Sequence, residues 1–299
     1  MATTYTEISS NKRRTVSLIL GFLVFIIALG WIFSRALGMY WIFPAAIIFA
    51  SVQALVSYWY SDKVTLAVSG AKPISREENV ALFRIIENLC ITAGLPTPRI
   101  YIINDPAPNA FATGRDPQHA VICFTTGILD KLEKPELEGV AAHELSHIGN
   151  YDIRLMTVIV ILVGVVALVS DWFLRISFFG GDDNRDSGQL GLILMIVGIV
   201  LAILAPIFAI ILQLALSRNR EYLADSSGAL LTRYPEGLAL ALEKISADTR
   251  PLKAANKATA HLYITNPLTD HKGTSRGWFA GLFDTHPPIE ERIKRLREM

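Results

Sequence analysis

The sequence carries little charge and almost no cysteine. Charged residues make up 18% of its 299 residues, the net charge is +1, and no basic stripe interleaved with aromatic residues is present. Proteins that bind nucleic acid gather lysine and arginine on one face, so no nucleic-acid partner is expected. Cys90 and Cys123 stand in apolar surroundings without a C-x-x-C partner. They are predicted to be buried thiols, which excludes a disulfide framework and a cysteine metal cage.

Apolar sequence is abundant instead. Hydrophobic residues account for 52% of the chain and the mean hydropathy is +0.39, above the composition of an ordinary soluble protein. Long runs with few or no charges predict four membrane-spanning helices arranged as two hairpins. These runs cover residues 16–33, 40–59, 155–169 and 190–216. The third run is short for a span, so buried core helices are the alternative for the second hairpin.

Charges at the ends of these runs predict the orientation in the bilayer. Lys12, Arg13 and Arg14 precede the first run and Arg218 follows the fourth, whereas the 171–189 loop of the second hairpin is acidic. By the positive-inside rule, both termini and the soluble regions should face the cytoplasm. The first run is longer than the apolar part of a signal peptide, which predicts a retained anchor.

The remaining sequence predicts a soluble domain that the second hairpin divides. We expect a tail and first hairpin in residues 1–60, a first domain part in 61–154, the second hairpin in 155–216 and a second part in 217–299. Ser75 and Glu78 have the spacing of a helix capping box. Residues 99–103 and 120–124 are typical of strands. The expected fold class is a membrane α-helical protein with a mainly α, α+β domain.

The segment His143-Glu144-Leu145-Ser146-His147 is an H-E-x-x-H motif. Pro135 and Glu136 suit a first helical turn, and Gly149 with Asn150 suits the helix end. On a helix the two histidines lie one turn apart on the same face, so both can bind a single zinc ion. Glu144 lies beside them and can take a proton from a zinc-bound water.

A catalytic zinc site needs a third protein ligand. Glu221 is the best candidate, because it begins a predicted helix directly after the fourth apolar run. Asp225 lies one turn later on the same face and could hydrogen-bond a ligand imidazole. The alternative is a solvated acidic helix face.

The segment Asn109-Ala110-Phe111-Ala112 lies between the two predicted strands. Its alternation suits an exposed edge strand, to which a protease could add an extended substrate as a further strand. An ordinary hairpin strand is the alternative.

Taken together, these motifs resemble the HtpX family of membrane-bound zinc metalloproteases, relatives of the prenyl-protein (CAAX) proteases. The resemblance covers nearly the whole chain and includes the run from Ser217 to Asp225 and Thr285-His286-Pro287-Pro288 followed by Glu291-Arg292-Ile293. It implies a gluzincin-type (zincin) metallopeptidase domain with one zinc ion per chain. The implied ligands are His143, His147 and Glu221, with Glu144 as base.

The resemblance also implies that His286 stabilises the transition state; a role in capping the last helix is the alternative. The implied role is degradation of damaged or misfolded inner-membrane proteins, so membrane-protein or unfolded polypeptide substrates and the lipid bilayer are the expected partners. Two other functions are considered: a non-hydrolytic membrane adaptor or chaperone-like factor, and a CAAX-type protease. The intact Glu144 argues against the first, and the small number of predicted spans argues against the second.

Overall fold

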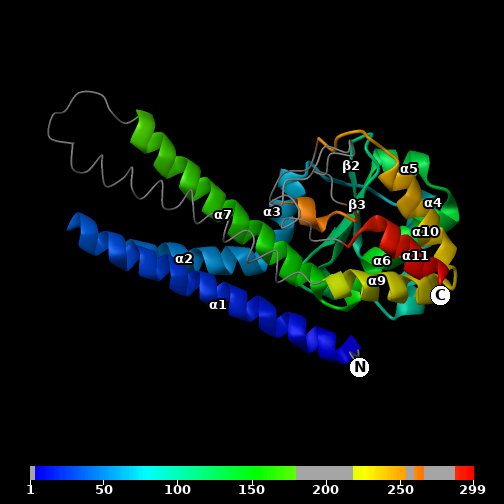
Figure 1. The fold of residues 1–299 in the computed structure, drawn as a ribbon, viewed down its shortest axis with the longest axis horizontal. Helices are drawn as coiled ribbons and strands as arrows, with labels where there is room; N and C mark the ends of the chain where they lie inside the picture. The colour runs from blue at the N-terminus through cyan, green and yellow to red at the C-terminus, as the bar shows by residue number, and fades with distance from the viewer. Residues whose placement is uncertain (1–3, 180–217, 254–258, 266–286) are drawn as a thin grey trace.

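The structure, a computed structural model, describes residues 4–179, 218–253, 259–265 and 287–299. A hairpin of two long helices, α1 (Thr4–Leu37) and α2 (Ile42–Trp59), projects from a globular part (Figure 1). Within it, Ile8–Ile32 and Ile42–Trp59 are long and apolar enough to cross a membrane. The predicted first hairpin is therefore confirmed, although helix α1 starts at Thr4 and includes the polar residues that were assigned to a tail.

The second predicted hairpin differs from its prediction in the part that is described. Helix α7 (Asp152–Phe179) runs without a break past residue 171, where the third run was expected to end. Its first half is buried and packs against α1. Helix α6 and the first half of α7 meet at a bend of 82°. If the two are counted as one broken span, they form a third candidate membrane span among the described residues. Residues 171–179 of the predicted loop are therefore helical, and the rest of the loop and the fourth run lie outside the described residues.

The globular part contains a four-stranded sheet in the order β1-β2-β4-β3. Its strands are β1 (Lys72–Pro73), β2 (Arg99–Ile103), β3 (Ala110–Thr113) and β4 (Val121–Thr125). Strands β2 and β4 are parallel, and β3 pairs antiparallel with β4 in a register that aligns Phe111 with Cys123. Both strands predicted from β-branched and aromatic residues are thus confirmed, and β3 forms one edge of the sheet.

Shorter helices surround the sheet. They are α3 (Ser61–Val68), α4 (Val80–Ala93), α5 (Thr126–Lys131), α9 (Arg218–Thr232), α10 (Pro235–Ser246) and α11 (Ile289–Arg297), with 3-10 turns η1 (Pro117–His119) and η2 (Ala260–Leu262). The capping-box prediction for α4 was wrong. The Asn79 side chain accepts from the backbone N–H of Leu82 and caps the helix, whereas Ser75 and Glu78 bond within a turn that precedes it.

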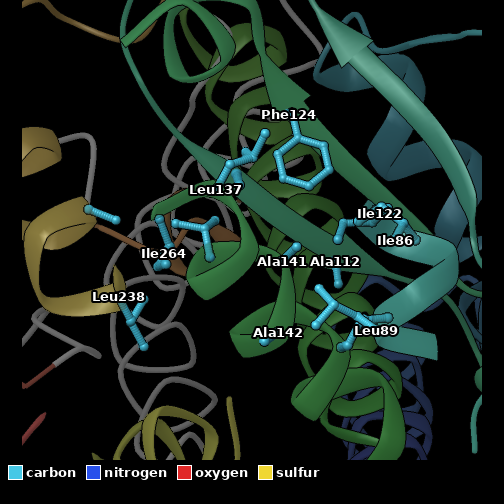
Figure 2. Close-up of a cluster of buried hydrophobic side chains, with 14 of the residues drawn as sticks. Ile86, Leu89, Ala112, Ile122, Phe124, Leu137, Ala141, Ala142, Leu238 and Ile264 are labelled. Atoms are coloured by element: carbon cyan, nitrogen blue, oxygen red, sulfur yellow. The ribbon is translucent and has the colours of Figure 1, made fainter. Parts of the chain in front are cut away.

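Helix α6 (Lys134–Gly149) is the central element of the globular part. A capping box between Glu133 and Glu136 starts it, and Asn150 ends it, close to both predicted ends. Figure 2 shows Leu137, Ala141 and Ala142 of this helix in the hydrophobic core among side chains from α4, the sheet and α10. Cys90 and Cys123 are buried and free, as predicted. The core therefore fixes the position of the helix that carries the H-E-x-x-H motif.

Candidate metal centre

Helix α6 places the two histidines of the motif side by side. His143 and His147 are 1% and 4% exposed, and their Nε2 atoms lie 3.2 Å apart. Two nitrogens bound to one tetrahedral zinc at 2.0–2.1 Å would be separated by about 3.3 Å. The observed separation therefore suits a shared metal ion.

A carboxylate from α9 completes the cluster. The Glu221 Oε1 atom lies 3.6 Å from His147 Nε2, and Oε2 lies 3.8 Å from His143 Nε2. One ligand atom from each of the three residues falls within 4.8 Å of the others. The fold thus brings Glu221 to the two histidines despite the long stretch of sequence between them.

The charges buried around this cluster also favour a cation. The carboxylates of Glu144, Asp152, Glu221 and Asp225 are buried. The buried guanidinium of Arg220 lies 3.7 Å from Asp152, and that of Arg292 lies 4.0 Å from Glu221 and 2.7 Å from Asp225. Among the described residues around the cluster, four carboxylates thus stand beside two guanidinium groups. Buried charge is costly unless it is paired, and a divalent ion would place further positive charge beside these acids.

Each histidine is oriented by a second carboxylate on its Nδ1 side. His147 Nδ1 lies 3.0 Å from Asp152 Oδ2, at the first turn of α7. His143 Nδ1 lies 2.9 Å from Asp225 Oδ1. A carboxylate on Nδ1 leaves Nε2 free to bind metal and fixes the orientation of the ring.

Arg292 holds Asp225 in turn. It is fully buried on α11, and its Nε and Nη2 atoms donate to the two oxygens of Asp225 at 2.8 and 2.7 Å. Its Nη1 donates to the carbonyl of Ile264 at 2.9 Å. Bidentate pairs of this kind are strong and directional, so α11 restrains α9 at the point where α9 meets His143.

The electrostatic environment separates the pKa values of the titratable groups. Burial lowers the pKa of His143. Burial also opposes charge on His147, but the hydrogen bond that its ring donates to Asp152 and the charge of Glu221 outweigh it and raise the pKa to about 9. The rise shows how strongly the acids around His147 attract positive charge.

Glu144 faces the edge strand β3. Burial raises the pKa of its carboxyl group to about 7, although the charge of His147 and a hydrogen bond from the Ala112 backbone act in the opposite direction. A carboxyl group that titrates near neutral pH can both accept and release a proton. The hydrogen bond from Ala112 places this predicted base beside the predicted edge strand.

Strand β3 is an edge strand, but it is not exposed as predicted. All four of its residues are buried. The backbone N–H of Ile264 donates to the carbonyl of Ala110 at 3.0 Å, and Asn109 Nδ2 donates to the Thr265 carbonyl at 3.1 Å. The segment 259–265 therefore covers the start of this edge, at Ala110. The backbone of Ala112, the next residue whose N–H and C=O point away from β4, lies beside Glu144.

The close contact between α6 and α9 depends on Gly228. A Cβ atom added there would lie 3.0 Å from the backbone nitrogen of His143. We expect Gly228→Ala to push α9 away from α6 and weaken zinc retention, because Glu221 and Asp225 are on the displaced helix. Gly164→Ala in α7, where an added Cβ meets nothing within 4 Å, is the control. Equal zinc retention in the two variants, measured by chelator competition, would contradict this.

Some site residues were not found from the sequence. Asp152 and Arg292 were assigned no role, although an acid so soon after the second histidine was a local signal for Asp152. Of the remaining histidines, His119 is at the surface beside Asp116. His286 and His271 lie outside the described residues.

Comparisons with known proteins show the family of the chain. The model of peptidase family M48 matches residues 76–299. A Protease HtpX homolog from Tropheryma whipplei (strain Twist) is 47% identical over 295 residues, which are 99% of this chain and 98% of that protein. A Protease HtpX homolog from Dictyoglomus turgidum is 48% identical over 303 residues, covering 99% and 95%. The crystal structure of S. mikatae Ste24p aligns with a TM-score of 0.49 at 18% identity, over 98% of this chain and 67% of that one.

Proposed function

Because the chain belongs to peptidase family M48 and is an HtpX-like membrane metalloprotease, we propose that it is a zinc-dependent endopeptidase whose metal ligands are His143, His147 and Glu221. The observation that supports this most directly is the convergence of one ligand atom from each residue within 4.8 Å. A non-hydrolytic adaptor is not favoured, since Glu144 is present, and neither is a CAAX-type protease.

In this proposal the chain's own groups handle the proton. A zinc ion bound by the three ligands would supply Lewis-acid polarisation of the peptide carbonyl and of the attacking water. Glu144, buried and with a pKa near 7, takes the proton from that water and passes it to the departing amine. His286 is proposed, from the family resemblance, to donate a hydrogen bond to the oxyanion. Asp152 and Asp225 keep the two imidazoles in place.

The substrate is proposed to be an extended polypeptide that pairs with β3. Backbone groups of alternate residues in an antiparallel strand face the free edge. Ala110 faces outward, because its carbonyl bonds to Ile264 while the carbonyl of Asn109 accepts from Thr125 of β4. The backbone N–H and C=O of Ala112 therefore also point toward the free edge, next to Glu144. A substrate strand added there would lie alongside the base, as strand addition requires.

We propose that damaged or misfolded membrane proteins are the substrates and that the peptidase domain and both termini face the cytoplasm.

The proposed membrane surface lies where the helical hairpin meets the globular part. Contacts between cationic and aromatic side chains occur there, as is typical of a membrane–water interface. Arg115 lies 4.8 Å from the Trp59 ring, Lys12 lies 4.2 Å from the Tyr151 ring, and Arg154 lies 5.5 Å from the Tyr58 ring.

This orientation predicts the result of a protease-accessibility measurement on intact cells. A tag after Met299 and a tag in the 61–154 region should both be shielded from protease added outside, since the cationic ends of the apolar runs remain inside. A tag within 182–188 should be cleaved. Cleavage of the Met299 tag from outside would invert the proposed orientation.

The proposed reaction can be tested with the purified full chain in detergent and a membrane-protein substrate. Cleavage should stop when a chelator removes the metal and should return on addition of zinc. Cleavage that persists after metal analysis shows complete zinc removal would contradict the proposal.

A further inference from the structure

The membrane-anchor helix reaches into the metal site through one polar side chain. Asn11 lies near the start of α1, within the apolar segment Ile8–Ile32, and is 1% exposed. A buried amide on an apolar helix is costly unless its polar atoms are bonded. The partners of its hydrogen bonds therefore indicate the structural role of Asn11.

All of these bonds lead to the surroundings of the metal ligands. Asn11 Nδ2 donates to Asp152 Oδ1 at 2.6 Å and to the carbonyl of Asn150 at 3.0 Å. Its Oδ1 accepts from Arg220 Nη1 at 3.0 Å. Asn150 ends the H-E-x-x-H helix, Asp152 starts α7, and Arg220 precedes the ligand Glu221. One amide thus joins three elements that carry or orient the ligands.

The bond to Asp152 continues directly to a ligand. Asp152 receives Asn11 on Oδ1 and His147 Nδ1 on Oδ2, at 2.6 and 3.0 Å. The two oxygens of the Asp152 carboxylate cannot rotate independently. The Asn11 amide, which holds Oδ1, therefore sets the direction in which Oδ2 meets His147. Arg220 also lies 3.7 Å from Oδ1. The orientation of the His147 ring therefore depends on a side chain of α1.

Packing between α1 and α7 fixes Asn11 at this point. Phe22 is buried on α1 and packs in one cluster with Leu155, Ile159 and Leu162 of α7. Thr15, one turn after Asn11, is also buried, and its hydroxyl donates to the Asn11 carbonyl at 2.9 Å. The same face of α1 thus runs from the apolar seam to the metal site. Figure 1 shows α1 beside α7, with its N-terminal end at the globular part.

We propose that Asn11 is a positioning residue of the metal site, so that the site is fully ordered only while α1 is docked against α7. The inference rests on the proposed function, since it concerns the same ligands. It makes the anchor helix part of the support behind the metal ligands and not only an attachment to the membrane. Loss of a group that bonds directly to a ligand typically lowers metal affinity or activity by about 10–100-fold, and Asn11 acts one step further out, through Asp152.

The test uses the full chain in detergent and measures the zinc dissociation constant by chelator competition. Asn11→Leu keeps a similar volume and the apolar packing but removes all three hydrogen bonds, and Arg220 remains near Asp152 to share the buried charge. We expect zinc binding to weaken by about 10-fold, the lower end of the range for direct partners of the ligands. Ser34→Ala removes a buried hydroxyl near the other end of α1, away from Asn11, and this control should bind zinc as the parent chain does.

A double-mutant cycle separates positioning from a general structural effect. If Asn11 acts through Asp152, then Asn11→Leu should weaken zinc binding little further in an Asp152→Asn background; independent effects would multiply. Parent-like zinc affinity in Asn11→Leu, or multiplied losses in the cycle, would overturn the inference while zinc binding by the parent chain left the proposed function standing. A parent chain that binds no zinc would instead overturn the proposed function.

Discussion

Glu144→Gln should abolish most hydrolysis and leave zinc binding and the fold intact. The amide has the shape of the carboxylate and can still accept the hydrogen bond from the Ala112 backbone, but it cannot take up the proton of the attacking water. General-base catalysis typically contributes about 10²–10⁴-fold, so the rate constant for cleavage should fall by that factor. The measurement is kcat on a membrane-protein substrate, with zinc content determined on the same sample.

Glu138→Gln is the matched control, since it makes the same change nearly two turns earlier on α6, where the Glu138 carboxylate lies 3.7 Å from Lys134. It should retain parent activity. Substantial residual cleavage by Glu144→Gln at full zinc occupancy would remove Glu144 from the proposed role.

The second large effect is expected at the third ligand. Glu221→Gln replaces a carboxylate with a weaker, neutral donor, so zinc affinity should fall by more than the factor of about 10–100 typical of outer-layer partners. Asp225→Asn should stay within that range, because Asp225 acts through His143. His143→Ala and His147→Ala provide the reference for loss of a ligand, and Glu290→Gln at the surface is the neutral control.

Asp225 needs one additional variant because Arg292 is buried against it. Removing one partner of a buried pair leaves an uncompensated charge and typically costs about 3–5 kcal/mol of stability, whereas replacing both partners is often neutral. Asp225→Asn combined with Arg292→Met therefore tests zinc affinity without an unpaired guanidinium. If these Asp225 variants lose zinc while Glu221→Gln retains it at equal free zinc, then Asp225 is the third ligand and the proposed ligand set is wrong by one helical turn.

The sequence could predict whatever depends on neighbours along the chain. The spacing of His143 and His147 predicts a shared face because a helix repeats every 3.6 residues. The apolar runs predicted the first hairpin because their length matches a bilayer. Strands 99–103 and 120–124 carried enough β-branched and aromatic residues to be found. The capping of α4 was mispredicted because two compatible caps, Ser75 and Asn79, lie close together, and local rules do not rank them.

Tertiary structure alone decided which distant groups meet. Nothing near Asn11 indicates that it bonds to Asp152, which lies 141 positions away, and nothing near Arg292 indicates that it holds Asp225. The alternating pattern of β3 predicted a strand at an edge, but packing of segment 259–265 determined that its residues are buried. Glu221 could be proposed as a ligand only as the best acid available; its position beside His143 and His147 follows from the packing of α9 on α6. Hydrogen bonds and ligand contacts between separate elements depend on how the core packs, and side-chain packing has no periodic signature in the sequence.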